Sequence, residues 1–417
     1  MKNNSKPLLL SDVQVFDGLT DGLSKETDVL IIDGRVDAIG TKLEAPSHSD
    51  RLNCSGLTMM PGLIDAHFHA YASDLDFAKL EDMPDTYHSL SGSALLNAAL
   101  SRGVTTVRDV GGADYGLWKG IEDGLIEGPR LFYGGRALSQ TGGHGDMRGP
   151  SIEPCGCASI GRLAQIVDGE DNIRKMVREE LRRGASHIKV FVSGGISSPN
   201  DPVWYQQYSS NELEAVVDEA TRRGRYVAAH AYTAEAVERA IDAGIRSIEH
   251  GNLIDARVAA KVAGAGAFVV PTLSAYDTIA KYGVEQGAPA SYLDKLEEVK
   301  AGGLNAIKLC KEAGVSLGFG TDLLGQLHQY QLGELLLRLE AETPYEVLKS
   351  ATSTNAALLK QDGHLGCIKP RAWADFLLLD FNPLTDLKKL VSKQGKVSIF
   401  KSGKQIVSND FLPSIPS

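Results

Sequence analysis

The chain has 417 residues, of which 43% are hydrophobic and 23% charged, so it is long enough for one large globular domain or for a large domain with a small one. Its net charge of −10 argues against a nucleic-acid partner, because such proteins present a basic surface. No apolar run approaches the roughly 20 residues that span a bilayer, and the leucines near the N-terminus are too few for a signal peptide. We therefore expect a cytoplasmic protein that acts on a small molecule, with neither a nucleic-acid nor a membrane partner.

The cysteines are scattered along the chain, and their number is odd. Cys155 and Cys157 form a C-x-C pair, but no second pair follows at the spacing of a zinc ribbon. Two cysteines this close in sequence are also poorly placed to bridge each other. We interpret the set as reduced thiols, typical of a reducing compartment, and not as a metal or redox site. The set is Cys54, Cys155, Cys157, Cys310 and Cys367.

Both ends of the chain show the pattern of short strands joined by turns. The Asp33-Gly34 pair separates two β-branched runs, and Gly403 stands at a turn near the C-terminus. These ends predict one small β-sandwich domain built from residues 1–58 and 366–417. The expected strand segments are 8–18, 28–40, 52–60, 373–387 and 397–407.

Between these ends, residues 59–365 repeat a strand, loop and helix pattern. Residues 172–185 carry an apolar stripe at helical spacing, and Ser209 and Glu212 have the spacing of a capping box ahead of another helix. Eight strands alternating with helices over about 300 residues predict a (β/α)8 barrel. A doubly wound open sheet is the alternative, made less favourable because no G-x-G-x-x-G follows the first strand. The expected strands are 63–69, 105–111, 130–138, 187–195, 226–233, 246–252, 267–273 and 316–322.

Chemically active residues fall where these strands end. In a barrel the strands' carboxyl ends form one face, which is where active sites lie. His67 and His69 are two apart, so strand alternation would turn both rings to the same side. A single histidine of this kind is more often a buried structural residue, but agreement along the whole strand order favours a shared site. The converging residues are His67, His69, Lys189, His230, His250 and Asp322.

Small residues are expected beneath this group. Gly318 and Gly320 share the face of Asp322, and Ala228 shares that of His230, which leaves room for a ligand sphere.

Lys189 lies inside an apolar strand, where an unpaired ammonium would be costly. It is either paired with a carboxylate such as Asp322 or has captured carbon dioxide as a carbamate, which would turn a cation into an anionic metal ligand. Ligands of this mixture suit zinc best, with manganese, cobalt or nickel as alternatives.

The stretches PGLIDAHFHA, HIKVFVSGG, AHAYT, SIEHGN and GFGTD, in this order, resemble the amidohydrolase superfamily, and within it the binuclear prolidase-like members related to imidazolonepropionase. The resemblance covers nearly the whole chain, although IKPRAWADFLLLD departs from the family's usual Gly-Lys-x-Ala-Asp stretch. It implies two divalent ions, most simply Zn²⁺, with Lys189 as a bridging N6-carboxylysine. The more buried ion would be bound by His67, His69 and Asp322, and the more exposed one by His230 and His250.

The resemblance also implies a mechanism. A hydroxide shared by the two metals would attack the scissile carbonyl, with Asp322 as general base and then acid towards the leaving nitrogen. Tyr232 at the mouth could hold the oxyanion or a substrate carboxylate, unless it only packs at the rim, and His144 in the Gly-rich loop is a second such candidate. Arg136, Arg148 and His328 are weaker candidates, and a surface role is preferred for both arginines.

Similar proteins cleave dipeptides, N-acyl amino acids and amide-bonded xenobiotics, including carboxylate-bearing mycotoxin amides. We therefore expect a metal-dependent hydrolase of an amide C–N bond, of the amidase, carboxypeptidase or dipeptidase kind. A carbamate or phenylurea hydrolase, a cyclic-amide hydrolase and a mononuclear deaminase of the same superfamily remain alternatives. A non-catalytic binding protein is disfavoured because no ligand is missing. The resemblance also implies a homo-oligomer.

Overall fold

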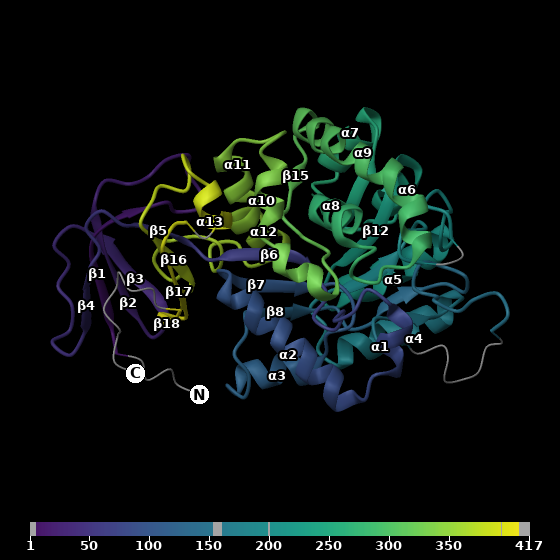
Figure 1. Cartoon of the computed structure of the whole chain (residues 1–417), viewed down its shortest axis with the longest axis horizontal. Coiled ribbons are helices and arrows are strands. Elements are labelled where there is room, and N and C mark those ends of the chain that lie inside the picture. The colour runs from purple at the N-terminus through teal and green to yellow at the C-terminus, as the bar shows by residue number, and fades with distance from the viewer. Residues whose placement is uncertain (1–5, 153–160, 199–200, 393, 408–417) are drawn as a thin grey trace. The chain divides into compact units, whose positions relative to one another are not determined.

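The computed structural model describes residues 6–152, 161–198, 201–392 and 394–407 (Figure 1). Two compact units are found in it. The first comprises Met1–Asp65, Ala98–Thr106 and Leu335–Ser417, and the second comprises Ala66–Asn97 and Val107–Glu334.

The first unit contains one sheet that joins both ends of the chain, as the sequence predicted. Its strand order is β18-β17-β16-β5-β1-β2-β3, with β4 paired to β1. The connection between the two ends is the antiparallel pairing of β16 with β5, in which Leu377 lies opposite Met60; the purple and yellow strands of Figure 1 carry this pairing. The strands are β1 (Leu8–Val15), β2 (Thr27–Ile32), β3 (Arg35–Gly40), β4 (Asp50–Asn53), β5 (Thr58–Pro61), β16 (Phe376–Leu379), β17 (Val397–Lys401) and β18 (Lys404–Val407).

Turn chemistry and apolar burial account for this sheet. Asp33 and Gly34 both have positive φ, 52° and 74°, as a two-residue hairpin between β2 and β3 requires. Across the β16–β17 pair, the rings of Phe376 and Phe400 stack with their centroids 4.4 Å apart in the core of the unit. Helices of this unit are α11 (Pro344–Lys349), α12 (Asn355–Leu358) and α13 (Lys388–Ser392), and a π-helical turn spans Ser350–Thr354.

The second unit is built on parallel strands with helices between them, and each strand segment expected from the sequence contains an observed strand. One sheet has the order β10-β9-β11-β12-β13-β14-β15, and β6, β7 and β8 form another. The chain crosses from one unit to the other within β6 and β7, and also within the helices of residues 85–101 and 333–338. The strands are β6 (Leu63–Phe68), β7 (Val104–Asp109), β8 (Arg130–Tyr133), β9 (Ala137–Ser139), β10 (Ala164–Ile166), β11 (Ile188–Phe191), β12 (Val227–Thr233), β13 (Ser247–Leu253), β14 (Phe268–Val270) and β15 (Ser316–Leu317).

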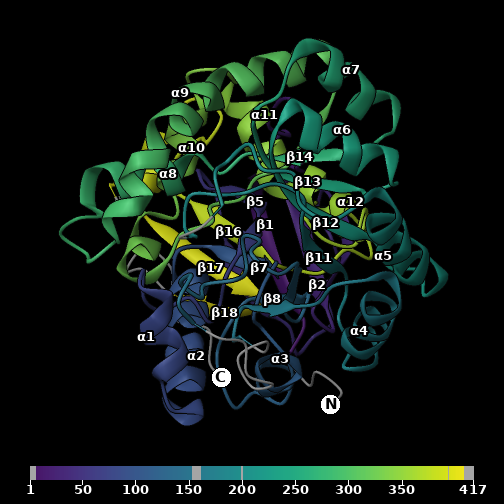
Figure 2. The same cartoon turned by 90° about the vertical axis from the view of Figure 1, so that its right-hand side faces the viewer.

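The helices of this unit turn their apolar stripes towards the strands. α4 buries Ile173 and Val177, and α5 begins with the predicted capping box between Ser209 and Glu212. Figure 2 shows α6 and α7 outside strands β12 to β14. The helices are α1 (Phe77–Asp82), α2 (Asp85–Ser101), α3 (Tyr115–Glu122), α4 (Glu170–Arg182), α5 (Ser210–Arg222), α6 (Ala234–Asp242), α7 (Ala256–Gly264), α8 (Leu273–Tyr282), α9 (Ala290–Ala313), η1 (Gly325–Tyr330) and α10 (Gly333–Arg338).

Backbone hydrogen bonds link the two parallel sheets at two places. Ala66 N on β6 donates to Phe319 O beyond β15 over 2.8 Å, and Ser186 N ahead of β11 donates to Tyr133 O at the end of β8 over 2.8 Å. β6 is thereby connected to the segment after β15, and β8 to the segment before β11.

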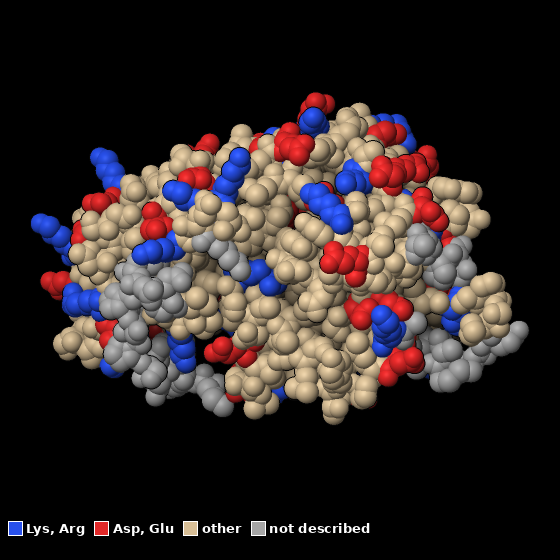
Figure 3. Space-filling model, viewed as in Figure 1, with Lys and Arg blue, Asp and Glu red and all other residues tan. Residues whose placement is uncertain are grey.

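The sequence also led to predictions about the thiols, about membrane-spanning segments and about the charge of the surface. Cys54, Cys310 and Cys367 are free and buried, and burial raises the pKa of Cys310 to about 12, so it is a poor nucleophile. Cys155 and Cys157 lie outside the described residues. Among the helices that are described, none is long and apolar enough to cross a membrane. Figure 3 shows acidic and basic side chains interspersed on the face that it draws.

Candidate active site

The expected site residues come together at the ends of the parallel strands of the second unit. They line one cavity of about 620 Å³. Gly320 shows how closely the strands approach there, because a Cβ at this position would lie 2.6 Å from the Cβ of His67. No side chain larger than hydrogen would therefore fit at position 320 without a shift of its neighbours. The strand-end residues that line the cavity are His67, His69, Lys189, His230, His250 and Asp322.

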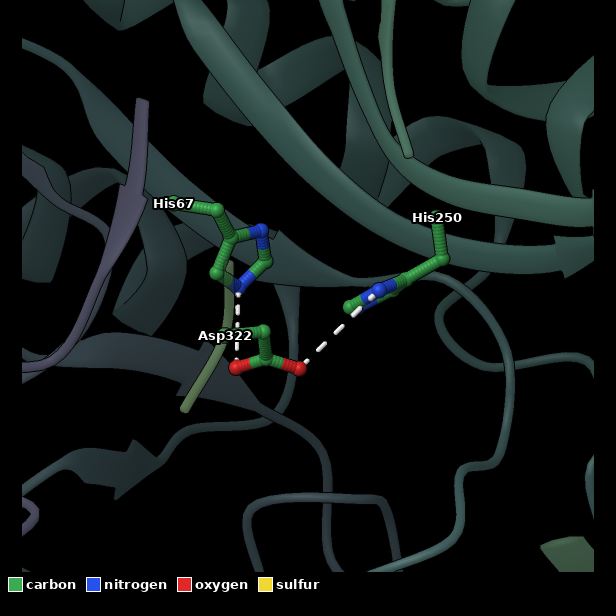
Figure 4. A group of neighbouring side chains, drawn as sticks. All are labelled: His67, His250 and Asp322. Atoms are coloured by element: carbon green, nitrogen blue, oxygen red, sulfur yellow. Dashed lines mark ion pairs between the residues drawn. The ribbon is translucent and has the colours of Figure 1, made fainter. Parts of the chain in front are cut away.

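The centre of this group is a cluster of His67, His250 and Asp322, whose ligand atoms all lie within 4.8 Å of one another (Figure 4). Asp322 Oδ1 lies 3.3 Å from His67 Nε2 and 3.2 Å from His69 Nε2, and Asp322 Oδ2 lies 4.0 Å from His250 Nδ1. His250 and Asp322 also have positive φ, 75° and 51°. Non-glycine residues in this region carry backbone strain, which is common where side chains are aimed at a functional site.

Burial sets the charge of the surrounding groups. It lowers the pKa of His230 and of His250 well below the ordinary value, so both imidazoles are neutral and keep a lone pair for a metal. Burial opposes the ionisation of Asp322, but the neighbouring His67 and His69 outweigh it and hold the pKa of that carboxyl well below its usual range. Burial also lowers the pKa of Lys189 to about 8, which brings its amine close to the neutral form.

His67 is oriented by a buried ion pair that sequence reasoning missed. Its Nδ1 lies 2.9 Å from Glu249 Oε2, which leaves Nε2 facing the cluster. Arg108 Nη2 donates to both oxygens of Glu249, over 2.7 and 2.8 Å, and neither side chain is exposed. A carboxylate behind a histidine fixes its tautomer and raises its basicity as a ligand. The signal was in the sequence, because Glu249 and Arg108, like Lys189, are charged residues inside apolar strands.

A second orienting contact holds His69. Its Nδ1 donates to the carbonyl oxygen of Gly111 over 3.0 Å, so Nε2 faces Asp322. The segment that carries this carbonyl is held by Asp109, whose carboxylate accepts backbone N–H groups of Ala70, Gly111 and Ala113. Burial raises the pKa of Asp109 to about 6 in spite of these bonds.

Of the residues expected to touch the substrate, Tyr232, His144 and Arg148 line the cavity. Tyr232 stacks on His250 with the ring centroids 4.9 Å apart, and His144 stacks on His230 at 4.4 Å. Arg148 donates two hydrogen bonds to the carboxylate of Asp146, over 2.7 and 2.6 Å.

The other two expected substrate contacts lie elsewhere. Arg136 lines a different cavity, of about 610 Å³, and its Nε donates to Gly161 O over 2.9 Å. His328 is buried against Phe68, with ring centroids 4.8 Å apart, and does not line the cavity of the strand-end cluster. The position of a residue in the sequence near a strand end does not determine where its side chain points.

Two hydroxyl groups beside His250 were not expected. Thr272 Oγ1 lies 2.8 Å and Tyr276 OH 2.9 Å from His250 Nδ1, and Tyr276 OH donates to Tyr232 OH over 3.2 Å. Because Tyr232 accepts this bond, its own hydrogen is available to the cavity. Tyr276 on α8 reaches His250 on β13 only in the folded chain, and no pattern in the sequence indicates this contact.

The donor set fits divalent metal ions. It combines neutral imidazoles with an ionised carboxylate and a lysine amine at one end of a cavity, and imidazole with carboxylate is the ligand combination of zinc hydrolases. The fold and this cluster define a class: an α/β protein with parallel strands and, at the strand ends, a carboxylate among imidazoles that could hold a metal ion.

Comparison with known proteins narrows the class. Residues 58–406 match the Amidohydrolase family. Ochratoxinase of Aspergillus niger is 31% identical over 404 residues, which cover 92% of this chain and 84% of that protein. The crystal structure of an amidohydrolase has a TM-score of 0.94 at 42% identity and covers 97% of this chain and 100% of its own. A prolidase complexed with N-methylphosphonate-L-proline has a TM-score of 0.93 at 40% identity, covering 96% and 99%.

The chain belongs to the amidohydrolase family. It is a hydrolase that acts on carbon–nitrogen bonds.

Proposed function

We propose that this protein hydrolyses the amide bond of an N-acyl amino acid, a dipeptide-like amide or a carboxylate-bearing xenobiotic amide. The observation that carries the proposal is the cluster of Asp322, His67 and His250 at the end of a large cavity, in a chain similar to an ochratoxinase and to a prolidase. Ochratoxinase is named for a mycotoxin and prolidase for proline dipeptides, and both names agree with amide substrates.

For the architecture, we propose a (β/α)8 barrel over residues 59–365 and a β-sandwich over 1–58 and 366–417. The hydrogen bonds from Ala66 to Phe319 and from Ser186 to Tyr133 support a closed ring of strands. The sheet shared by both termini supports the composite domain. A cytoplasmic location and a homo-oligomer remain predictions.

For the metal centre, we propose two zinc ions, with Lys189 as an N6-carboxylysine between them. A lysine amine whose pKa is near 8 is partly neutral at physiological pH, and only a neutral amine attacks carbon dioxide. The product is a carbamate and one released proton. His67, His69 and Asp322 would hold one ion, while His230 and His250 would hold the other.

In the reaction, the chain's own groups bind, orient and move protons. When bound, the ions would lower the pKa of a water molecule and polarise the substrate carbonyl. Asp322 is ionised and faces the cavity, so it accepts the proton of the attacking water and later donates it to the leaving nitrogen. The hydroxyl of Tyr232 donates to the oxygen on which charge develops. His144 contacts the substrate beside it.

The cavity wall favours an apolar group on the substrate. Phe77, Leu163 and Ile279 line it, together with Arg148 and the acidic Asp146 on the loop after β9. Because Arg148 is already paired with Asp146, we propose that it helps to hold a substrate carboxylate without being its sole partner.

The proposal is tested by offering zinc-loaded protein a panel of N-acyl amino acids, dipeptides, carbamates, ureas and cyclic amides. Release of a free amino acid is the expected result. The variant Asp322→Asn should lose at least about a hundredfold in turnover, the contribution of a positioned general base, while its circular dichroism stays unchanged. Full activity of this variant would show that the base is wrongly assigned, and ammonia release without amino-acid release would favour a deaminase.

The metal proposal has a separate test. Wild-type protein prepared with bicarbonate should contain two zinc ions per chain by elemental analysis, and Lys189→Met should contain at most one. A single tightly bound ion in the wild type would contradict the binuclear centre and favour the mononuclear alternative. Lys261→Met is the matched control, because Lys261 pairs with Glu238 on the surface.

A further inference from the structure

Beside the strand-end cluster lies a buried polar network around His144. The ring of His144 stacks on that of His230, with the centroids 4.4 Å and the planes 19° apart. Ser198 and Asp201 lie at the Nδ1 edge of the ring, and Gln207 contacts the backbone of His144. Each of these three residues is almost completely buried. The reaction proposed above uses none of these three residues.

The contacts of the ring determine which nitrogen carries hydrogen. His144 Nδ1 lies 2.8 Å from Ser198 Oγ and 3.5 Å from Asp201 Oδ2. Ser198 Oγ donates its own hydrogen to Gly195 O over 3.4 Å, so it is left to accept from the ring. Two acceptors facing Nδ1 favour the tautomer with hydrogen on Nδ1. Nε2 then lies on the opposite edge of the ring, 3.3 Å from Ser197 Oγ, which also lines the cavity.

Asp201 is itself fixed on several sides. Its Oδ2 accepts from Gln207 Nε2 over 2.9 Å and from Gly195 N over 3.2 Å. Gln207 Oε1 in turn accepts from His144 N over 3.0 Å. One amide side chain therefore connects the backbone of the histidine with the carboxylate that faces its ring.

The loop that carries Asp201 is anchored by α9. Lys295 Nζ donates to the carbonyl oxygens of Gly195, Ser198 and Asp201, over 3.0, 2.8 and 2.9 Å. The ring of His144 lies against the backbone of Gly195, since a Cβ there would be 2.1 Å from its Cε1. The imidazole is thus held between Gly195 on one face and His230 on the other.

We infer that Asp201 is a positioning residue for His144: with Ser198 and Gln207 it keeps Nδ1–H turned into the protein and Nε2 turned to the substrate. The inference rests on the proposed function only in placing the substrate in this cavity. In the neutral ring Nε2 has a lone pair, so His144 accepts a hydrogen bond from the substrate's amide N–H or leaving nitrogen. Tyr232 then remains the donor to the oxyanion.

The orientation is tested directly by nitrogen NMR of zinc-loaded protein with ¹⁵N-labelled histidine, the His144 signals being assigned by their loss in His144→Gln. The expected spectrum has Nδ1 protonated and Nε2 unprotonated. A wild-type spectrum with hydrogen on Nε2 alone would overturn the inference. This measurement needs no substrate, so it decides the orientation even if the panel above finds no amide that is cleaved.

The effect on the reaction is tested by a double-mutant cycle in kcat/KM. Asp201→Ala should lower kcat/KM about tenfold, and Asp201→Asn, which keeps an oxygen acceptor, should restore most of it. In the His144→Gln background, Asp201→Ala should have no further effect, because a positioning residue acts only through its partner. An equal loss in both backgrounds would show a merely structural role and overturn the inference.

The matched control is Asp168→Ala. Asp168 holds the loop of His144 at Thr141, accepting from its N over 3.0 Å and from its Oγ1 over 2.6 Å, and is not hydrogen-bonded to the imidazole, whose partners are Ser198 and Ser197. Its removal should leave kcat/KM within about twofold of the wild type. A tenfold loss in this control would mean that any loosening of the loop suffices, and would contradict a specific role for Asp201.

Discussion

The cavity has two sides that are supported in different ways. On the strand-end side, His67 and His250 stand on β6 and β13, and the Arg108–Glu249 pair fixes His67 from behind. On the loop side, His144 and its neighbours stand on the connections after β9 and β11. The connection after β11 is held by a β-bridge between Ser193 and Gln206 and by hydrogen bonds from Lys295 to three backbone carbonyl oxygens.

The difference indicates that the two sides of the cavity have different roles. Strand residues have each backbone group fixed by the ladder, so they can hold metal ligands to the small tolerance that coordination requires. Loop residues can change without disturbing the sheet, and binding residues are often found on loops carried by a rigid scaffold. Changes on the strand-end side should therefore affect metal binding and every substrate. Changes on the loop side should alter substrate preference and leave the metal content intact.

The largest effect is expected from Glu249→Gln. The substitution removes the charge that orients His67 and leaves Arg108 buried beside a neutral amide. We expect zinc affinity to fall about 10- to 100-fold and the free energy of unfolding to fall by roughly 3 kcal/mol or more. Competition with a chromophoric chelator measures the first, and urea unfolding measures the second.

Glu180→Gln is the control for this change. Glu180 is also a buried glutamate of the second unit, and it lies outside the strand-end cluster. Burial raises the pKa of its carboxyl, so an amide of the same shape costs little. Unchanged zinc affinity in Glu249→Gln would contradict the orienting role of the ion pair and would remove the contrast between the two sides.

On the loop side, Lys295→Met should have a smaller and different effect. It keeps most of the side chain and removes the ammonium that holds three carbonyl groups. We expect KM to rise roughly tenfold, as loss of bonds to a charged donor suggests, with zinc content unchanged. Hydrogen exchange in residues 193–208 should become faster. Lys300→Met is the control, because Lys300 is on the same helix and pairs with Asp277 at 3.7 Å. A loss of zinc in Lys295→Met would show that the two sides are not independent.

The same contrast explains what could be predicted from the sequence. The strand segments and the proposed metal ligands at their ends followed from local patterns, because alternation and chain order determine which face and which end a residue occupies. The hairpin turn at Asp33-Gly34 could also be predicted from the sequence, because the backbone conformation of such a turn depends on only two residues.

The partners of those ligands could not be predicted in this way. Glu249 and Arg108 are 141 residues apart, and Asp201 and Lys295 are 94 apart, so only the folded chain brings them together. Arg136 illustrates the reverse case: it was expected within a strand of 130–138, but it lies in the turn after β8 and its side chain lines another cavity. For a loop residue, neither periodicity nor spacing determines the direction of the side chain.

The smallest effect is expected at His88, which lies outside the cavity on the strand-end side. His88 on α2 is buried against Tyr71, with ring centroids 4.2 Å apart, and its ring nitrogens have no hydrogen-bond partner within the part of the chain that the structure describes. Burial and the nearby Arg162 lower the pKa of His88 to about 4 from 6.5. In the unfolded chain this histidine takes up its proton as the pH falls below 6.5, whereas in the folded chain it does so only near pH 4.

Between these two values the unfolded state binds more protons, so stability is lost as the pH falls from about 6.5 to about 4. Phenylalanine fills a similar volume and does not titrate. The melting temperature of His88→Phe should therefore gain on that of the wild type between pH 7.5 and pH 5 by a few degrees, measured by differential scanning calorimetry of the zinc-loaded protein. The exposed His364 provides the control variant His364→Phe, for which no such gain is expected. If the difference in melting temperature between His88→Phe and the wild type did not change with pH, burial of a neutral imidazole would not limit the stability of the protein at low pH. The interactions that stabilise the strand-end side would then not extend beyond the wall of the cavity.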